Sequence, residues 1–394
     1  MEKEKEIKTV VPALRFPEFQ GMIGWEKTYI YEESPNPYSG GTPKTTEKKY
    51  YGGNIPFIRS AEIGKDKTEL SITQEGLNSS SAKMIQKGDL LIALYGANSG
   101  DIAISKIDGA INQAILCLKA KSNNLFIYYT LLKKQKDIVS KYLQGGQGNL
   151  SGEIIKSIDF YIPQEIEQQK IANCLSSLDE LIEATAQKVR ALEKHKKGLM
   201  QRLFPAEGKN VPDLRFPEFQ ASEKWKRKII QDICNITTGN KNTQDKKENG
   251  IYPFFVRSPK VERIDSWSFD GEAILTAGDG VGVGKIFHYY VGKMGVHQRV
   301  YLLYDIQCNS KYLYYFFSEF FYERVKKMSA KNSVDSVRKD MISDMPLLLP
   351  SSQEQQKIAD CLSSLDELIE ATSRKVEILK EHKKGLMQQL FPKI

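Results

Sequence analysis

Two segments of the chain place hydrophobic residues at alternating steps of four and three, with polar residues in between. This spacing is the a/d pattern of a heptad repeat and predicts one long helix in each segment. The segments run from Glu167 to Pro205 and from Glu354 to Pro392, and they are identical at 31 of 39 positions. The hydrophobic positions, here called the seam, are Ile171, Leu175, Leu178, Ile182, Val189, Leu192, Leu199 and Leu203, and Ile358, Leu362, Leu365, Ile369, Val376, Leu379, Leu386 and Leu390.

A seam this narrow, on a helix of about 57 Å, must be buried against another surface. The simplest partner for each seam is the other copy. Two similar halves related by a pseudo-twofold axis bring their equivalent helices together antiparallel, so an antiparallel coiled-coil pair is predicted. The alternative is that each helix packs only on its own domain. Both seams have a gap, at Lys196 and Lys383, where the pattern would otherwise continue.

A second repeat precedes each half, because VPALRFPEFQ at 11–20 matches VPDLRFPEFQ at 211–220 at nine of ten positions. Between each lead-in and its helix, short apolar runs flanked by Gly, Asn and Asp predict buried strands and turns. Each body also contains one aromatic helical stretch, so we predict a duplicated α+β domain. The predicted division is into lead-ins at 1–20 and 206–220, bodies at 21–162 and 221–349, and conserved helices at 163–205 and 350–394.

Composition narrows the class of protein. No apolar run approaches the roughly 20 residues of a membrane span, and the N-terminal MEKEKEIKTV has no apolar stretch typical of a signal peptide. The five cysteines form no C-x-x-C pair, which favours reduced thiols of a cytoplasmic protein over disulfides or a zinc site. A net charge of +8 permits a nucleic-acid partner without establishing one.

Candidate catalytic motifs are incomplete. Asn36-Pro37-Tyr38 lacks the second proline of the loop with which DNA adenine methyltransferases grip a flipped base, and reads as a turn. The segment GDGVGVGK at 278–285 lacks the frame of a phosphate loop, because Ile286 follows its lysine. The four histidines do not cluster. We therefore predict no catalytic, cofactor-binding or metal-binding residues in this chain.

The repeated helix, its lead-in and the loop motifs resemble the specificity (S) subunit of Type I restriction–modification systems. The resemblance covers nearly the whole chain. The motifs that carry it are P-x-x-x-E-Q-x-K-I-A at 163–172, S-G-G-T-P-K at 39–44 and N-I-P-F-I-R-S at 54–60. The second body lacks the G-T-P and has TTGNKNTQ at 237–244 instead.

This resemblance implies two target recognition domains, each reading one half of a bipartite, asymmetric DNA sequence. The helices would then separate these domains, set their spacing and dock two methyltransferase subunits. The chain itself would be non-catalytic and hold no cofactor. S-adenosylmethionine, ATP and Mg²⁺ are expected in the partner subunits, which include a restriction and translocation subunit in the full complex.

DNA recognition requires Lys and Arg for phosphates, and Arg, Asn, Gln, Ser and Thr for base edges. Loops of the first body offer Lys44, Thr45, Arg59, Tyr95, Asn98, Asn112, Gln113, Gln147 and Asn149. Loops of the second offer Lys241, Asn242, Arg257, Lys285, His297, Gln298, Arg299, Lys331, Asn332 and Arg338. Two alternative functions are a self-contained DNA adenine methyltransferase and a bivalent protein scaffold that binds no DNA.

Overall fold

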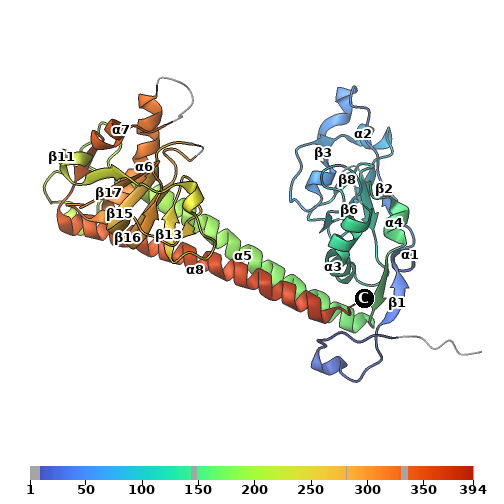
Figure 1. Ribbon diagram of the computed structural model, residues 1–394. Helices are drawn as coiled ribbons and strands as arrows, with labels where there is room; N and C mark the ends of the chain where they lie inside the picture. The colour runs from blue at the N-terminus through green and yellow to red at the C-terminus, as the bar shows by residue number, and fades with distance from the viewer. Residues whose placement is uncertain (1–8, 143–148, 281, 330–335, 394) are drawn as a thin grey trace, which may run out of the picture. The chain divides into compact units, whose positions relative to one another are not determined.

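The computed structural model describes residues 9–142, 149–280, 282–329 and 336–393. The chain divides into two compact units (Figure 1). Unit 1 comprises Met1–Ala184 and Lys375–Ile394, and unit 2 comprises Thr185–Arg374. Each unit therefore contains one lead-in, one body and parts of both long helices.

Unit 1 is built mainly of short strands. These are β1 Glu26–Tyr29, β2 Tyr38–Ser39, β3 Tyr51–Ile58, β4 Ser71–Ile72, β5 Lys83–Ile85, β6 Leu90–Ala93, β7 Ile102–Ile104, β8 Gly109–Ile111, β9 Ile115–Leu118 and β10 Asp159–Ile162. They form sheets in the orders β2-β9-β6-β7, β4-β3-β8-β5 and β1-β10. The helices are α1 Ile30–Glu33, α2 Gln74–Asn78, α3 Asn124–Tyr142 and α4 Gly152–Lys156, with short 3-10 turns η1 Pro17–Phe19, η2 Lys48–Tyr50 and η3 Ser60–Glu62.

Unit 2 repeats this plan with longer strands. These are β11 Lys226–Ile229, β12 Asn235–Thr238, β13 Tyr252–Phe255, β14 Glu262–Ile264, β15 Phe269–Ala277, β16 Phe287–Val296, β17 Val300–Tyr304 and β18 Pro346–Leu349. The sheets have the orders β12-β17-β15-β16-β13-β14 and β11-β18. The helices are α6 Ser310–Met328 and α7 Lys339–Ser343, with η4 Pro217–Phe219, η5 Ile230–Asp232 and η6 Thr243–Asp245.

One parallel strand pair marks the equivalence of the two bodies. In unit 1, β3 runs parallel to β8, with Ile58 opposite Ile111. In unit 2, β13 runs parallel to β16, with Phe255 opposite Val296. Among the described strands, all other pairings are antiparallel. The predicted α+β fold with two repeated domains is confirmed.

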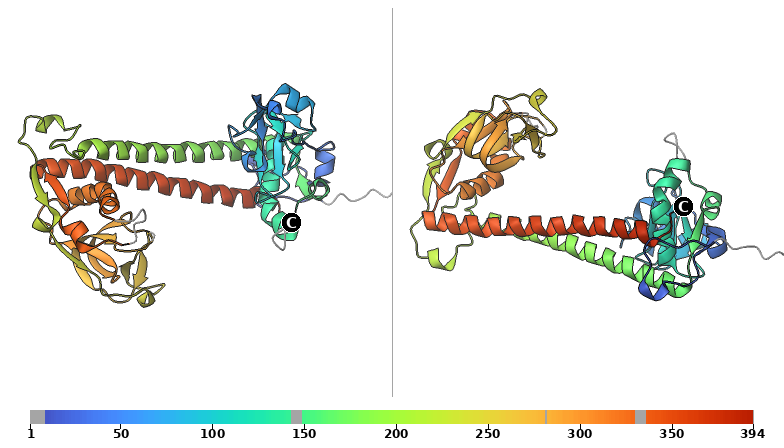
Figure 2. Two further views of the ribbon diagram at one scale, coloured as in Figure 1. Left: turned by 90° about the horizontal axis from the view of Figure 1, so that it is seen from above. Right: turned by 60° about the horizontal axis from the view of Figure 1, so that its bottom comes forward.

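Both predicted long helices are present as unbroken helices of 39 residues each, α5 Glu165–Leu203 and α8 Ser352–Leu390 (Figures 1 and 2). None of the seam residues is exposed. Those that are fully buried are Ile171, Leu175, Leu203, Ile358, Leu362, Val376 and Leu390, and the others are partly buried.

The first part of α5 and the last part of α8 run antiparallel within unit 1. Glu167 near the start of α5 accepts a hydrogen bond from Trp25 Nε1 at 3.2 Å, and the Trp25 ring packs on Phe391 with centroids 6.0 Å apart. One helical stretch further, Asp179 of α5 binds Lys383 of α8 at 2.5 Å. Residue numbers thus increase along α5 in the direction in which they decrease along α8, so the two helices are antiparallel.

Unit 2 contains the equivalent arrangement, with the end of α5 packed beside the start of α8. Lys196 of α5 binds Asp366 of α8 at 2.5 Å, and Leu203 shares the core of this unit with Ile358. Phe204, directly after α5, is fully buried against Tyr312, with ring centroids 5.3 Å apart. The alternative that each helix packs only on its own domain is therefore wrong, because the end of α5 completes the core of the second body.

The repeated lead-in is a clamp on the first turns of the helix in its own unit. Arg15 donates two hydrogen bonds to Glu167, at 2.9 and 2.7 Å, and the two side chains are only 6% and 2% exposed. Arg215 donates to Glu354 in the same way in unit 2, both at 2.8 Å. The arginines belong to the two LRFPEF motifs and the glutamates to the two EQQKIA motifs. The ion pair therefore explains why both motifs are repeated together in each half of the chain.

Each lysine in a seam gap binds one aspartate and one tyrosine. In unit 1, Tyr129 of α3 donates its hydroxyl to Asp179 at 2.8 Å, and Lys383 lies 5.2 Å from the centroid of the same ring. In unit 2, Tyr315 of α6 donates to Asp366 at 2.7 Å, and Lys196 lies 5.0 Å from its ring. A charged residue interrupts the seam because it joins both long helices to the aromatic helix of the body.

Candidate nucleic-acid interface

Four segments of unit 1 are joined by backbone hydrogen bonds at the end of the parallel strand pair. Gly40, after β2, donates to Asn112 O at 3.2 Å in the turn that follows β8. Leu94, after β6, donates to Ala114 O in the same turn at 2.7 Å. Leu150, just before α4, donates to Leu94 O at 3.0 Å. Four loops that are distant in sequence thus form one surface.

Unit 2 holds the equivalent segments together in the same way. Lys241, after β12, donates to Val296 O at 3.0 Å. Gly278, after β15, donates to Arg299 O at 2.8 Å, and Val337 donates to Gly278 O at 2.7 Å. The backbone frame of the two surfaces is therefore shared, although most of the side chains on it differ.

A glycine without room for a side chain lies in both frames. A Cβ on Gly40 would be 1.8 Å from the carbonyl oxygen of Ile111, and a Cβ on Gly239 would be 2.0 Å from that of Val296. Because both contacts are to backbone, neither can be relieved by a rotamer change. Gly239 thus takes the place of Gly40 although TTGNKN has no G-T-P, and the sequence comparison did not reveal this equivalence.

Gly40→Ala is expected to push the loop after β2 away from the turn after β8, at a cost of about 1–3 kcal/mol for the overpacking. Thermal unfolding and hydrogen exchange of the two loops measure the effect. Gly152→Ala is the matched control, since its Cβ meets only Leu116 Cδ1 at 3.7 Å, an ordinary contact. Equal unfolding temperatures and equal exchange rates of the two variants would show that the loop can move aside without loss of stability.

In unit 1 the predicted residues with amide side chains gather on this frame. Asn112 Oδ1 accepts a hydrogen bond from Ala114 N at 3.1 Å, and Gln113 Oε1 accepts one from Thr42 Oγ1 at 2.8 Å. Asn98 donates to Asp101 at 3.0 Å. The predicted residues that are exposed around them are Lys44, Thr45, Tyr95 and Asn149. Gln147 lies outside the described residues.

Arg59 follows β3 and is already paired. It binds Glu62 at 3.0 Å and Glu69 at 2.5 Å, and Glu62 is 2% exposed. Two carboxylates neutralise this guanidinium, so Arg59 holds the turn after β3 rather than presenting an uncompensated positive charge.

In unit 2 the predicted residues are more strongly basic. Arg257 and Arg299 bind opposite oxygens of Asp279, at 3.0 and 2.8 Å. Gln298 is exposed beside them, whereas Arg338 pairs with Asp340 at 3.3 Å. Lys331 and Asn332 lie outside the described residues.

The remaining predicted residues of unit 2 are engaged locally. Lys241 donates to Ser266 Oγ at 2.9 Å, and Lys285 lies 4.7 Å from the ring centroid of Tyr322. The backbone N–H of Asn242 donates to Asp245 at 2.7 Å, which fixes the turn η6.

His297 occupies the position of Asn112 but is turned into the protein, with 4% of its surface exposed. Its Nδ1 accepts the Arg299 N–H at 3.0 Å, so Nε2 carries the proton and donates to Thr243 Oγ1 at 3.2 Å. Burial, followed by the charge of Arg257, lowers the pKa of this imidazole, so it is neutral at pH 7. It stabilises the turn that carries Arg299.

A family model for the Type I restriction modification DNA specificity domain matches the chain twice, at residues 36–194 and 222–381. The chain belongs to this family of DNA specificity subunits. Membership implies DNA as the target and assembly with other subunits of a Type I restriction–modification system. Each match covers most of one body and most of the long helix that follows it.

Two specificity subunits of known restriction enzymes are similar to parts of this chain. The Type I restriction enzyme MjaVIII specificity subunit of Methanocaldococcus jannaschii is 24% identical over 345 residues, which cover 78% of this chain and 79% of the relative. The EcoDI specificity subunit of Escherichia coli is 29% identical over 171 residues, 42% of this chain and 37% of the relative. Both are named as specificity subunits and not as catalytic subunits.

The fold of this specificity subunit is similar to a crystal structure of the S subunit of a Type I restriction–modification system from M. genitalium. The TM-score is 0.70 at 16% sequence identity, with 98% of this chain and 100% of that chain covered. The resemblance to Type I specificity subunits that the sequence motifs indicated is therefore confirmed by the family model.

The last residue of the candidate methyltransferase motif lies in a strand. Tyr38 of Asn36-Pro37-Tyr38 lies in β2 and donates its hydroxyl to Met84 O at 3.0 Å. Within the described ranges, no group of three or more His, Cys, Asp or Glu residues is arranged to hold a metal ion. No helix in the same part of the chain has the length and apolar character to cross a membrane.

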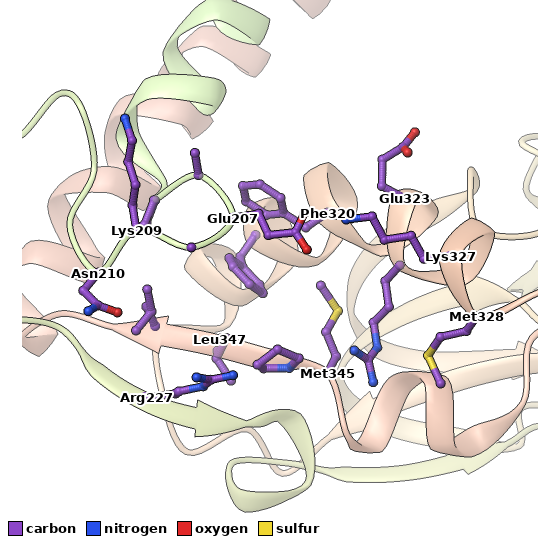
Figure 3. Close-up of a pocket in the computed structure, with 17 residues that line it drawn as sticks. Glu207, Lys209, Asn210, Arg227, Phe320, Glu323, Lys327, Met328, Met345 and Leu347 are labelled. Carbon is purple, nitrogen blue, oxygen red and sulfur yellow. Dashed lines mark hydrogen bonds and ion pairs between the residues drawn. The ribbon is translucent and has the colours of Figure 1, made fainter.

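A cavity of about 450 Å³ in unit 2 was not foreseen from the sequence (Figure 3). It lies between the segment after α5, helix α6 and strand β18, with Phe320, Met345 and Leu347 in its lining and an ion pair between Glu207 and Lys327 at its edge. None of the predicted DNA-binding residues that the structure describes lines it. The cavity therefore lies beside the start of the second lead-in and is not part of the candidate interface.

Proposed function

We propose that this chain is the non-catalytic sequence-specificity subunit of a Type I restriction–modification complex, and that each body reads one half of a bipartite, asymmetric DNA target. The observation that carries the proposal is a common backbone frame with different side chains. Asn112 and Ala114 of unit 1 stand where unit 2 has His297 and Arg299. A duplicated scaffold that presents different side chains on equivalent loops fits a protein that reads two different half-sites.

The long helices are proposed to set the spacing of the half-sites and to dock two methyltransferase subunits. Supporting this role, identity between the repeats extends to exposed side chains at equivalent positions, namely His195, Lys197 and Gln201 of α5 and His382, Lys384 and Gln388 of α8. An identical surface on both helices suits two copies of one partner.

A glycine in the last two turns of both helices supports the same docking surface. A Cβ on Gly198 or Gly385 would meet no atom within 4 Å, so the fold of this chain gives no reason to avoid alanine there. Glycine costs a helix about 1 kcal/mol relative to alanine. Close approach of a partner backbone accounts for its presence in both copies.

In this proposal the catalytic groups belong to other chains. S-adenosylmethionine is held by the methyltransferase subunits, and ATP and Mg²⁺ by the restriction and translocation subunits, which act with this chain on double-stranded DNA in the cytoplasm. Recognition and chemistry are thereby separated.

Exchange of residues 21–162 for the corresponding body of another specificity subunit is expected to change one half of the methylated sequence and to leave the other half intact. Exchange of 221–349 is the matched experiment and changes the opposite half. Sequencing of methylated sites in cells that express the modification subunits reads both results. A change in both halves after a single exchange contradicts the modular proposal.

A further inference from the structure

We infer that Arg257 and Arg299 form a guanine-reading pair in unit 2, and that Asp279 is the positioning residue that orients both guanidinium groups. This inference rests on the proposed function and adds to it the class of base that the second half-site must contain.

The three side chains form a fork on one carboxylate. Arg257 Nη1 binds one oxygen of Asp279 at 3.0 Å and Arg299 Nη1 binds the other at 2.8 Å. The side chain of Asp279 is 17% exposed, whereas those of Arg257 and Arg299 are 44% and 61% exposed. Within the part of the chain that the structure describes, neither guanidinium donates to any other group, so four of the five N–H donors of each remain for a ligand.

The backbone under Arg299 is held on both sides. Its N–H donates to the buried ring of His297 at 3.0 Å, and its carbonyl accepts from Gly278 at 2.8 Å. Gly278 in turn accepts from Val337 at 2.7 Å. The exposed guanidinium therefore extends from a fixed turn, which lowers the entropy lost when it binds a base.

The carboxylate argues for a base edge over a phosphate. Burial raises the pKa of Asp279, but the hydrogen bonds and charges of Arg257 and Arg299 together lower it below its usual range, so the group is ionised at neutral pH. This carboxylate lowers the net charge of the three side chains and so weakens their attraction for a phosphate. Guanine presents two neutral acceptors, O6 and N7, which need no full positive charge, and Arg to guanine is the commonest specific contact in the major groove.

Among the residues of the first body that the structure describes, there is no such pair. Tyr95 stands where unit 2 has Asp279, and Ala114 stands where it has Arg299, as the shared backbone hydrogen bonds show. Arg59 is already neutralised by its two glutamates. The inference therefore applies to the second half-site alone.

The test begins with the full chain and its methyltransferase subunits, by sequencing methylated sites for the wild type and for exchange of 221–349. The half that this exchange changes is the second half-site, and it is expected to contain guanine. Duplexes that carry 7-deazaguanine at each guanine of that half, one at a time, then remove N7 without changing base pairing. At one or two of these positions the affinity of the wild-type complex is expected to fall about 10-fold, which corresponds to about 1.4 kcal/mol.

Three variants distinguish base reading from phosphate binding. Arg299→Ala and Arg299→Lys are both expected to relax the methylated motif at the same guanine and to abolish the effect of 7-deazaguanine there, because lysine keeps the charge but lacks the planar fork. Asp279→Asn, which releases two arginines from their carboxylate, is expected to steepen the salt dependence of binding and to weaken discrimination at that guanine. A purely structural role of Asp279 would not steepen the salt dependence.

A second half-site without guanine overturns the inference. So does recovery of wild-type specificity by Arg299→Lys together with a uniform loss of affinity in Arg299→Ala, which identifies a phosphate contact. Both results leave the proposed function intact. If exchange of 221–349 changes neither half, it is the proposed function that fails.

Discussion

Glu167→Ala is expected to destabilise unit 1 by about 3–5 kcal/mol, the usual cost of removing one partner from a buried ion pair. The substitution leaves the guanidinium of Arg15, whose side chain is 6% exposed, without its carboxylate. It also removes the acceptor of Trp25 Nε1. Because typical domains are stable by only 5–15 kcal/mol, this loss is a large fraction of the total.

Denaturant unfolding and hydrogen exchange, resolved by peptide, measure the effect in each unit. Glu18→Ala is the control, because Glu18 binds Lys170 at the surface with about half of its side chain exposed, and its stability should stay close to that of the wild type. Glu354→Ala should weaken unit 2, but by less, since Trp225 Nε1 has no hydrogen-bond partner to lose. A loss below about 1 kcal/mol in Glu167→Ala would show that the clamp is solvated.

The clamp illustrates how far the sequence could be interpreted. The identity of the two LRFPEF and EQQKIA motifs revealed a duplication, and the heptad spacing predicted both helices, because a 3.5-residue period is a local property of the chain. That the arginine of one motif binds the glutamate of the other could not be predicted. The two residues are 152 positions apart, and only the folded body brings them together.

The seam gaps show the same limit. Lys196 and Lys383 were visible as interruptions, but a lysine at a heptad core position has no partner within its own helix. Its partners are an aspartate on the opposite long helix and a tyrosine on the aromatic helix of a body. Three elements must be placed before this contact is defined.

The candidate interface was predicted as a set of loops but not as residues with roles. Arg59 and Arg257 both lie just after the strand of the parallel pair in their body, yet Arg59 is neutralised by Glu62 and Glu69, whereas Arg257 shares Asp279 with Arg299. The difference lies in which acidic residue the neighbouring loops supply. Single-sequence patterns do not contain that information, because the partners come from separate turns.

A chain that ends at Pro205 is expected to form a symmetric dimer that reads an interrupted palindrome. In unit 1 of the full chain, the cradle for the end of α8 includes the contacts of Lys383 with Asp179, of Phe391 with Trp25, and of Leu14 N with Gln389 O at 2.9 Å. The truncated chain lacks α8, but α5 ends in a nearly identical sequence, with Arg202 in the position of Gln389. Lys196 and Phe204 match Lys383 and Phe391, and the third contact uses only backbone.

The α5 helix of a second molecule can therefore fill the cradle of the first, and the exchange is reciprocal. A closed twofold dimer results, because pseudo-symmetry within one chain becomes true symmetry between two. Both bodies are then copies of the first body. A twofold axis relates their half-sites, so the target becomes the first half-site followed by its inverted copy.

The experiment expresses residues 1–205 with the methyltransferase subunits, measures the oligomeric state, and sequences the methylated sites. Lys196→Asp in the truncated chain faces Asp179 of the second copy with a like charge and should weaken the dimer. Adding Asp179→Lys restores an opposite-charge pair at both contacts and should recover it. An inactive monomer would contradict the pairing of the long helices, and an active fragment that keeps the asymmetric sequence would contradict the assignment of one half-site to each body.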